Sequence, residues 1–142
     1  MKISDVISWV DEVKPNAFPD WVKLEWISAL EGRIAADVFL MNAAEVRALA
    51  YKYPADMETE LLVEPPHDDI YGYWVQAKID EANGEYTKYV NTLQIYNGHY
   101  SDFVRWFANV YAPAQGYRSE ENAERAGPRA DGDQIILIME GG

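Results

Sequence analysis

Residues able to bind a metal ion or transfer protons gather at one place in the sequence, His67-Asp68-Asp69, with Glu64 just before them. Glu64 and His67 form a Glu-x-x-His pattern, which in di-iron helical bundles places two ligands on one helix face. Two prolines occupy the middle of this pattern, and proline is not accommodated in a helix interior. We therefore predict no metal ion and no cofactor, and interpret the aspartates as acidic residues that favour a helix start.

Other kinds of active site have as little support. Asp69 and Asp80 could act as an acid–base pair, but paired carboxylates arise by chance in a chain with 24 acidic residues. The sequence contains no Gly-x-Ser-x-Gly, Gly-Lys-Ser/Thr or Gly-x-Gly-x-x-Gly motif, and its lack of cysteine excludes thiol chemistry. We predict that the protein is not an enzyme. The enzyme alternative is a hydrolase that uses the carboxylates of Asp68 and Asp69.

The chain is strongly acidic, with a formal charge of -12 over 142 residues, which argues against a protein that grips nucleic acid. Hydrophobic residues make up 49% of the sequence, enough for one folded domain. No apolar run approaches the roughly 20 residues of a membrane span, and the N-terminus lacks a signal-peptide pattern, so we expect a soluble intracellular protein without membrane contact.

Residues 56–69, which we call the acidic segment, form a candidate surface that repels polyanions or meets a basic partner. Its carboxylates are those of Asp56, Glu58, Glu60, Glu64, Asp68 and Asp69.

The candidate residues named so far must be positioned by helices, because apolar residues recur at helical spacing along the chain. A first helix is predicted with Ser4 as its N-cap and an end at Lys14, before a proline. A second helix is predicted from Pro19 to Val38, with Gly32 as a site of close packing. Residues 43–53 extend that helix or form a separate one, and 54–66 is a connector with an extended Leu61-Leu62-Val63 stretch.

The longest helical pattern runs from about Pro66 to Tyr111. Asn83-Gly84 lies in its middle and predicts a break or sharp bend, followed by a helix from Glu85. We therefore predict an all-α bundle of four to five helices with long third and fourth helices. The predicted helical domain covers residues 1–113.

The remaining residues, 114–142, are predicted to form a flexible arm, since residues 114–133 offer almost nothing to bury. Five apolar residues follow, which predict a short strand or plug that docks on this protomer or the next. These candidate self-association residues are Ile135, Ile136, Leu137, Ile138 and Met139. An alternative is that the arm folds back on the Leu61-Leu62-Val63 stretch of its own chain.

Several strings together suggest a family, although none is a catalytic motif. They are Lys2–Ile7, Val13–Asn16, Trp26–Ile34, Glu60–Tyr71, Ala77–Tyr86 and Tyr89–Asn91. As a set they resemble the small head–tail connector (adaptor, head-completion) proteins of tailed phages and prophages. The resemblance covers roughly Met1 to Pro113.

The resemblance implies an all-helical, non-enzymatic subunit that joins its own copies in a ring beneath the portal. The implied partners are other copies, the portal protein and tail-completion proteins, and DNA would pass through the ring without sequence-specific binding. The implied location is the virion and the bacterial host cytoplasm. The acidic arm departs from the family pattern, so no role is carried over to it. The alternative function is a stand-alone acidic protein-binding module, such as an assembly chaperone or a DNA-mimicking inhibitor.

Overall fold

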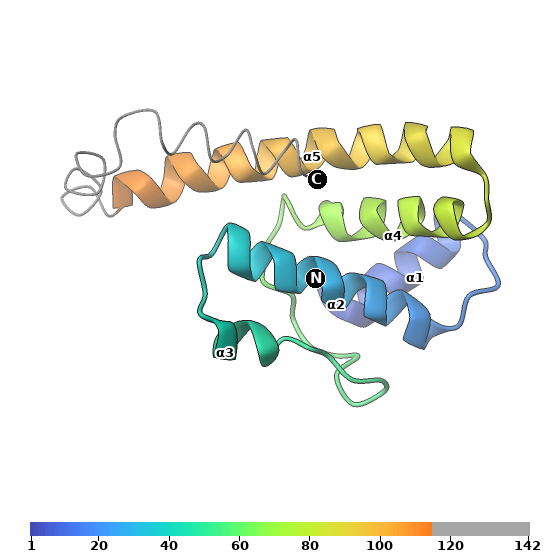
Figure 1. Ribbon diagram of the computed structural model, residues 1–142, viewed down its shortest axis with the longest axis horizontal. Coiled ribbons are helices and arrows are strands. Elements are labelled where there is room, and N and C mark those ends of the chain that lie inside the picture. Colours follow the sequence, from blue (N-terminus) through green and yellow to red (C-terminus); the bar gives the residue numbers. More distant parts are fainter. Residues whose placement is uncertain (115–142) are drawn as a thin grey trace. The chain divides into compact units, whose positions relative to one another are not determined.

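The computed structural model describes residues 1–114, and within this range the fold is all-α, as predicted. The helices are α1 (Ile3–Val13), α2 (Asp20–Asp37), α3 (Ala43–Arg47), α4 (Asp69–Ala82) and α5 (Tyr86–Ala114) (Figure 1). No helix in this part of the chain is both long enough and apolar enough to cross a membrane.

The chain divides into two compact units, Met1–His99 and Tyr100–Gly142. In the second unit the rings of Tyr100, Phe103 and Phe107 follow one another along α5, with centroid separations of 6.1 and 6.0 Å. The predicted arm from residue 115 onward, with the candidate residues Ile135–Met139 and their predicted strand, lies outside the described residues.

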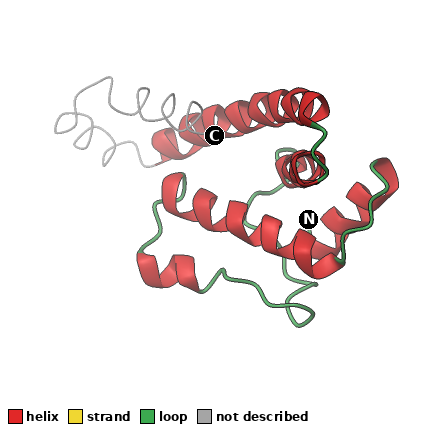
Figure 2. Ribbon diagram, turned by 45° about the vertical axis from the view of Figure 1, so that its right-hand side comes forward, coloured by secondary structure: helices red, strands yellow, loops and turns green. Residues whose placement is uncertain are grey.

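The core of the first unit is built on α4, which packs against both α1 and α2 (Figure 2). The predicted apolar stripe of α2 supplies three fully buried residues, and α1 and α4 supply others. The side chains with no measurable exposure include Val6, Val10, Ile27, Leu30, Ile34 and Val75. Burial of each such side chain contributes roughly 1.5–3 kcal/mol, so these three helices form the stable frame of the first unit.

Helix α1 begins earlier than predicted, and Ser4 is not its N-cap. The N-cap is Lys2, whose N–H donates to the Asp5 carboxylate at 3.0 Å. The N–H groups of Ile3 and Ser4 donate to the carbonyls of Thr59 and Met57, at 3.2 and 2.9 Å. Because the connector supplies backbone acceptors for the first turn, no capping hydroxyl is needed there. The predicted end of the helix at Lys14 is confirmed.

The close approach predicted at Gly32 is wrong. The nearest atom to a Cβ at Gly32 would be Cγ1 of Val46 at 3.8 Å, an ordinary contact. The glycine that permits close packing is Gly72 on α4, where a Cβ would lie 1.6 Å from the Trp9 ring. Trp9 in turn meets Tyr73 edge-on at 5.5 Å. A glycine on a crowded helix face therefore sets the distance between α1 and α4.

The break predicted at Asn83-Gly84 is confirmed. Asn83 is the C-cap of α4, and Gly84 has a φ of 74°, a left-handed conformation that glycine adopts without steric cost. The N–H of Gly84 donates to the Glu81 carbonyl and that of Glu85 to the Asp80 carbonyl, both at 3.0 Å. This pair of bonds is the Schellman motif, which ends α4 and lets the first half of α5 turn back alongside it (Figure 1).

Residues 43–53 contain a short separate helix, α3, rather than an extension of α2. Its N-cap is Asn42, which exchanges two hydrogen bonds with Glu45 at 2.9 and 3.0 Å. The connector that follows has cis peptide bonds at Tyr53-Pro54 and Pro65-Pro66. Its extended stretch is no strand: among the described residues only an isolated bridge pairs Lys2 with Glu60.

Candidate functional site

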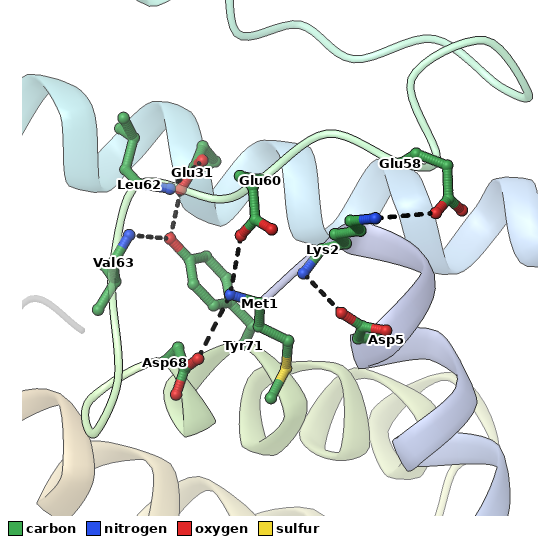
Figure 3. Close-up of polar contacts among 10 residues, drawn as sticks. All are labelled: Met1, Lys2, Asp5, Glu31, Glu58, Glu60, Leu62, Val63, Asp68 and Tyr71. Atoms are coloured by element: carbon green, nitrogen blue, oxygen red, sulfur yellow. Dashed lines mark hydrogen bonds and ion pairs between the residues drawn. The ribbon is translucent and has the colours of Figure 1, made fainter.

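The acidic segment, residues 56–69, lies against the N-terminus. The Met1 ammonium lies 3.2 Å from Oε2 of Glu60 and 3.4 Å from Oδ2 of Asp68, and Lys2 Nζ lies 3.6 Å from Glu58 (Figure 3). Burial alone would lower the pKa of the Met1 ammonium, but its hydrogen bond to Glu60 and the charge of Asp68 outweigh burial and raise it. The structure thus brings Glu60 and Asp68 together around one cation.

The other candidate carboxylates of the acidic segment have separate surroundings. Asp56 accepts a hydrogen bond from the Lys52 N–H at 2.7 Å, and Asp69 lies 3.1 Å from Nδ1 of His99. Glu64, like Glu58 and Glu60, is exposed, whereas Asp68 is buried. The three exposed carboxylates of the segment are therefore glutamates, and two of them, Glu58 and Glu60, are paired with Lys2 and the Met1 ammonium.

The carboxylate pairs considered for hydrolysis are not assembled. Asp69 and Asp80 are eleven residues apart on α4, about 16 Å along the helix axis. Asp68 faces the Met1 ammonium and Asp69 faces His99, so the two neighbours point to different partners. Within residues 1–110, no group of three His, Cys, Asp or Glu side chains is placed to hold a metal ion.

A buried carboxylate that the sequence analysis missed lies at the centre of the first unit. Glu31 on α2 is fully buried, and its Oε2 accepts hydrogen bonds from the Tyr51 hydroxyl and the Leu62 N–H, both at 2.9 Å. Its Oε1 accepts a hydrogen bond from the Tyr71 hydroxyl, which itself accepts one from the Val63 N–H (Figure 3). We call these five residues the Glu31 centre. It joins α2 and α4 to Tyr51, which precedes the connector, and to Leu62 and Val63 within the connector.

The partners of Glu31 are neutral donors, and this determines its ionisation. Burial raises the pKa of Glu31, while the hydrogen bonds from Tyr71, Leu62 and Tyr51 oppose the rise. Burial and the nearby carboxylate also raise the pKa of both tyrosine hydroxyls, which therefore remain protonated donors. The sequence contains a signal for this centre, because Glu31 falls on the apolar stripe beside Leu30 and Ile34.

A second buried carboxylate has a different set of partners. Asp80 on α4 receives the Lys14 ammonium on both oxygens, at 2.8 and 2.7 Å, and the Thr92 hydroxyl at 2.8 Å. We call these three residues the Asp80 centre. It joins the end of α1 to α4 and to the first half of α5. Both centres stabilise the fold, and Tyr51 of the Glu31 centre also lines a hollow beside α2.

The surfaces available for binding are of two kinds. Large apolar side chains are exposed along α5, among them Tyr86 at 68%, Val90 at 50% and Ile95 at 49% exposure. A hollow of about 390 Å³ lies between α2 and α3, and residues such as Ala29, Gly32, Val46 and Leu49 line it.

Comparison with known proteins adds no further information: no protein-family model, no curated protein and no solved structure matches the chain.

Proposed function

We propose that the chain is a non-enzymatic subunit of a phage head–tail connector, a ring of identical copies beneath the portal through which DNA passes. The observation that carries this proposal is the exposure of Tyr86, Val90 and Ile95 on α5. A helix of 29 residues is about 43 Å long, and large apolar side chains left exposed along it favour contact with another protein surface. The resemblance to connector proteins supplies the identity of the assembly.

The charge of the chain supports the second part of the proposal, passage of DNA without binding. The sequence has 24 acidic and 12 basic residues, so a wall formed by this protein repels phosphate over a Debye length of about 8 Å. The glutamates Glu58, Glu60 and Glu64 of the acidic segment are exposed and are candidates for such a wall, although Glu58 is paired with Lys2 and Glu60 with the Met1 ammonium. Repulsion of this kind keeps DNA mobile within the ring.

The same three exposed glutamates favour a second candidate function, a stand-alone module that binds a basic protein. Such a module would remain a monomer or dimer, and its complex would weaken as salt concentration rises. A connector subunit assembles through apolar contacts, which salt does not weaken in this way.

Electron microscopy of the purified chain, alone and mixed with its portal protein, tests the proposal. We expect rings, or added density beneath the portal. Small particles that leave the portal unchanged would contradict it. If such particles bound a basic protein at low salt and released it at high salt, the second candidate would replace the first.

A further inference from the structure

The hollow between α2 and α3 offers apolar surface that no described side chain fills. The lining comprises Glu25, Ser28, Ala29, Gly32, Val46, Leu49, Ala50 and Tyr51. Its volume of about 390 Å³ lies at the lower end of the range of roughly 300–1,000 Å³ typical of pockets for small molecules. Helices α2 and α3 contact one another, and both contribute to the lining.

Two of the three polar side chains at this hollow are engaged already, and the third, Glu25, lies at an exposed position. The Ser28 hydroxyl donates to the Leu49 carbonyl at 3.0 Å and accepts from the Tyr51 N–H at 3.1 Å. The Tyr51 hydroxyl donates to Glu31. An occupant therefore gains mainly by burying apolar side chains, and an apolar segment suits this hollow better than a charged one.

The chain itself carries such a segment, the run Ile135–Met139. Twenty residues, 115–134, separate it from Ala114 at the end of the described part. At about 3.3–3.6 Å per extended residue they reach about 70 Å, which is ample to cross to a neighbouring copy.

The other site considered for this segment, the connector stretch Leu61-Leu62-Val63, is already occupied. Its three N–H groups donate to the Met1 carbonyl, Glu31 and the Tyr71 hydroxyl. The side chains of Leu61 and Val63 are buried. An added strand would find neither free donors nor exposed side chains on these residues.

We propose that the hollow between α2 and α3 of one copy binds the Ile135–Met139 segment of a second copy. This inference rests on the proposed ring, because the contact joins two different surfaces of the same chain. Such head-to-tail contacts repeat from copy to copy and form a closed ring when the rotation between copies allows it.

Cross-linking tests this contact directly, since the native chain has no cysteine. Copies carrying Ala29→Cys are mixed with copies carrying Leu137→Cys and oxidised, and mass spectrometry of the digested product identifies the linked positions. We expect position 29 of one copy linked to position 137 of the other. The matched control is Ala36→Cys, an exposed alanine two turns further along α2 that does not line the hollow. It is expected to cross-link several-fold less.

A second pair of variants measures assembly in the full chain. Ala29→Arg places a long charged side chain in the hollow at an exposed helix position, so we expect a native circular dichroism spectrum and loss of the multimer. Ala36→Arg is expected to retain the multimer. Equal effects of the two substitutions would overturn the inference.

The remaining outcomes separate this inference from the proposed function. Cross-links confined to single chains that carry both Ala29→Cys and Leu137→Cys would assign the segment to its own copy and overturn the inference. Rings in the microscope without any link from position 29 to position 137 would overturn it and leave the connector proposal standing. A cross-link between positions 29 and 137 without rings in the microscope would support the contact and contradict the proposed head–tail connector function.

Discussion

The Glu31 centre and the Asp80 centre place carboxylates in the same core and stabilise them by different means. Glu31 is surrounded by two hydroxyl donors and one amide donor, all of them neutral. Asp80 accepts a two-point contact from the Lys14 ammonium and one hydroxyl. Neutral donors satisfy hydrogen bonds but do not cancel charge, so burial raises the pKa of Glu31.

The two centres also connect different parts of the first unit. The Glu31 centre attaches the connector to α2 and α4 through the N–H groups of Leu62 and Val63 (Figure 3). The Asp80 centre attaches α1 and the first half of α5 to α4. A loop can be held by its own amide groups, whereas helices, whose amides bond internally, must be joined through side chains.

The largest effect is expected from Glu31→Ala. The substitution leaves the hydroxyls of Tyr51 and Tyr71 and the Leu62 N–H without their acceptor, and each such loss costs about 1–3 kcal/mol when the group is buried. We expect the free energy of unfolding, measured by urea denaturation, to fall by about 3–5 kcal/mol. The control Asp37→Ala, at an exposed position on the same helix, should change it by less than about 0.5 kcal/mol. Equal losses for both variants would show that the centre contributes nothing specific.

The next largest effect is expected from Lys14→Met, which removes the cation from Asp80. Because the Lys14 side chain is 23% exposed, we expect a loss of about 2–3 kcal/mol, less than for a fully buried pair. Adding Asp80→Asn should recover part of that loss, since the uncompensated charge is then absent. A double-mutant cycle measures the recovery. A double variant as unstable as the sum of the two single variants would contradict a direct pairing of charge.

The pH dependence of stability tests the Glu31 centre separately. The raised pKa of Glu31 means that its stabilising contribution is fully present below its ordinary value of 4.5 and is lost as pH rises through the raised value. Relative to a Glu31→Gln variant, which cannot ionise there, the native chain should lose stability as pH rises from 4.5 toward neutrality. Denaturation series of both proteins across this range provide the measurement. Parallel curves would contradict a buried carboxylate whose pKa is raised by folding.

The smallest effects are expected from single hydroxyl deletions at the edges of the two centres. Tyr51→Phe removes one of three donors to Glu31, and Thr92→Val removes the hydroxyl donor to Asp80. Each should cost about 1 kcal/mol, the net contribution of one hydrogen bond. Thermal unfolding compares the two. If either variant lost more stability than Lys14→Met, that hydroxyl donor would contribute more to the free energy of unfolding than the charge pair, contrary to this account.

Local signals allowed much of the helical pattern to be predicted. The proline after Lys14, Pro19 and Asn83-Gly84 act through the backbone of their own neighbours, so the corresponding ends and starts were predicted to within one residue. The start of α1 and the close contact at Gly72 were missed because they depend on residues far away in the chain. Thr59 and Met57 supply acceptors to the first turn, and Trp9 packs on Gly72. Glu31 could have been identified, since a charge on an apolar stripe marks a buried polar centre.

For the acidic segment, the sequence could predict only that many carboxylates occur close together in the chain. A run of carboxylates in sequence does not reveal which of them meet a cation, and the ammonium of Met1, 59 residues from Glu60, selects Glu60 and Asp68. Glu58, Glu60 and Glu64 are the exposed members of the run.

Native mass spectrometry of the full 142-residue chain tests the central claim most directly. The connector proposal predicts one dominant multimer of many copies, and a chain lacking residues 134–142 is expected to shift toward smaller species while its helical circular dichroism signal remains unchanged. A full chain present only as monomer or dimer would contradict the ring.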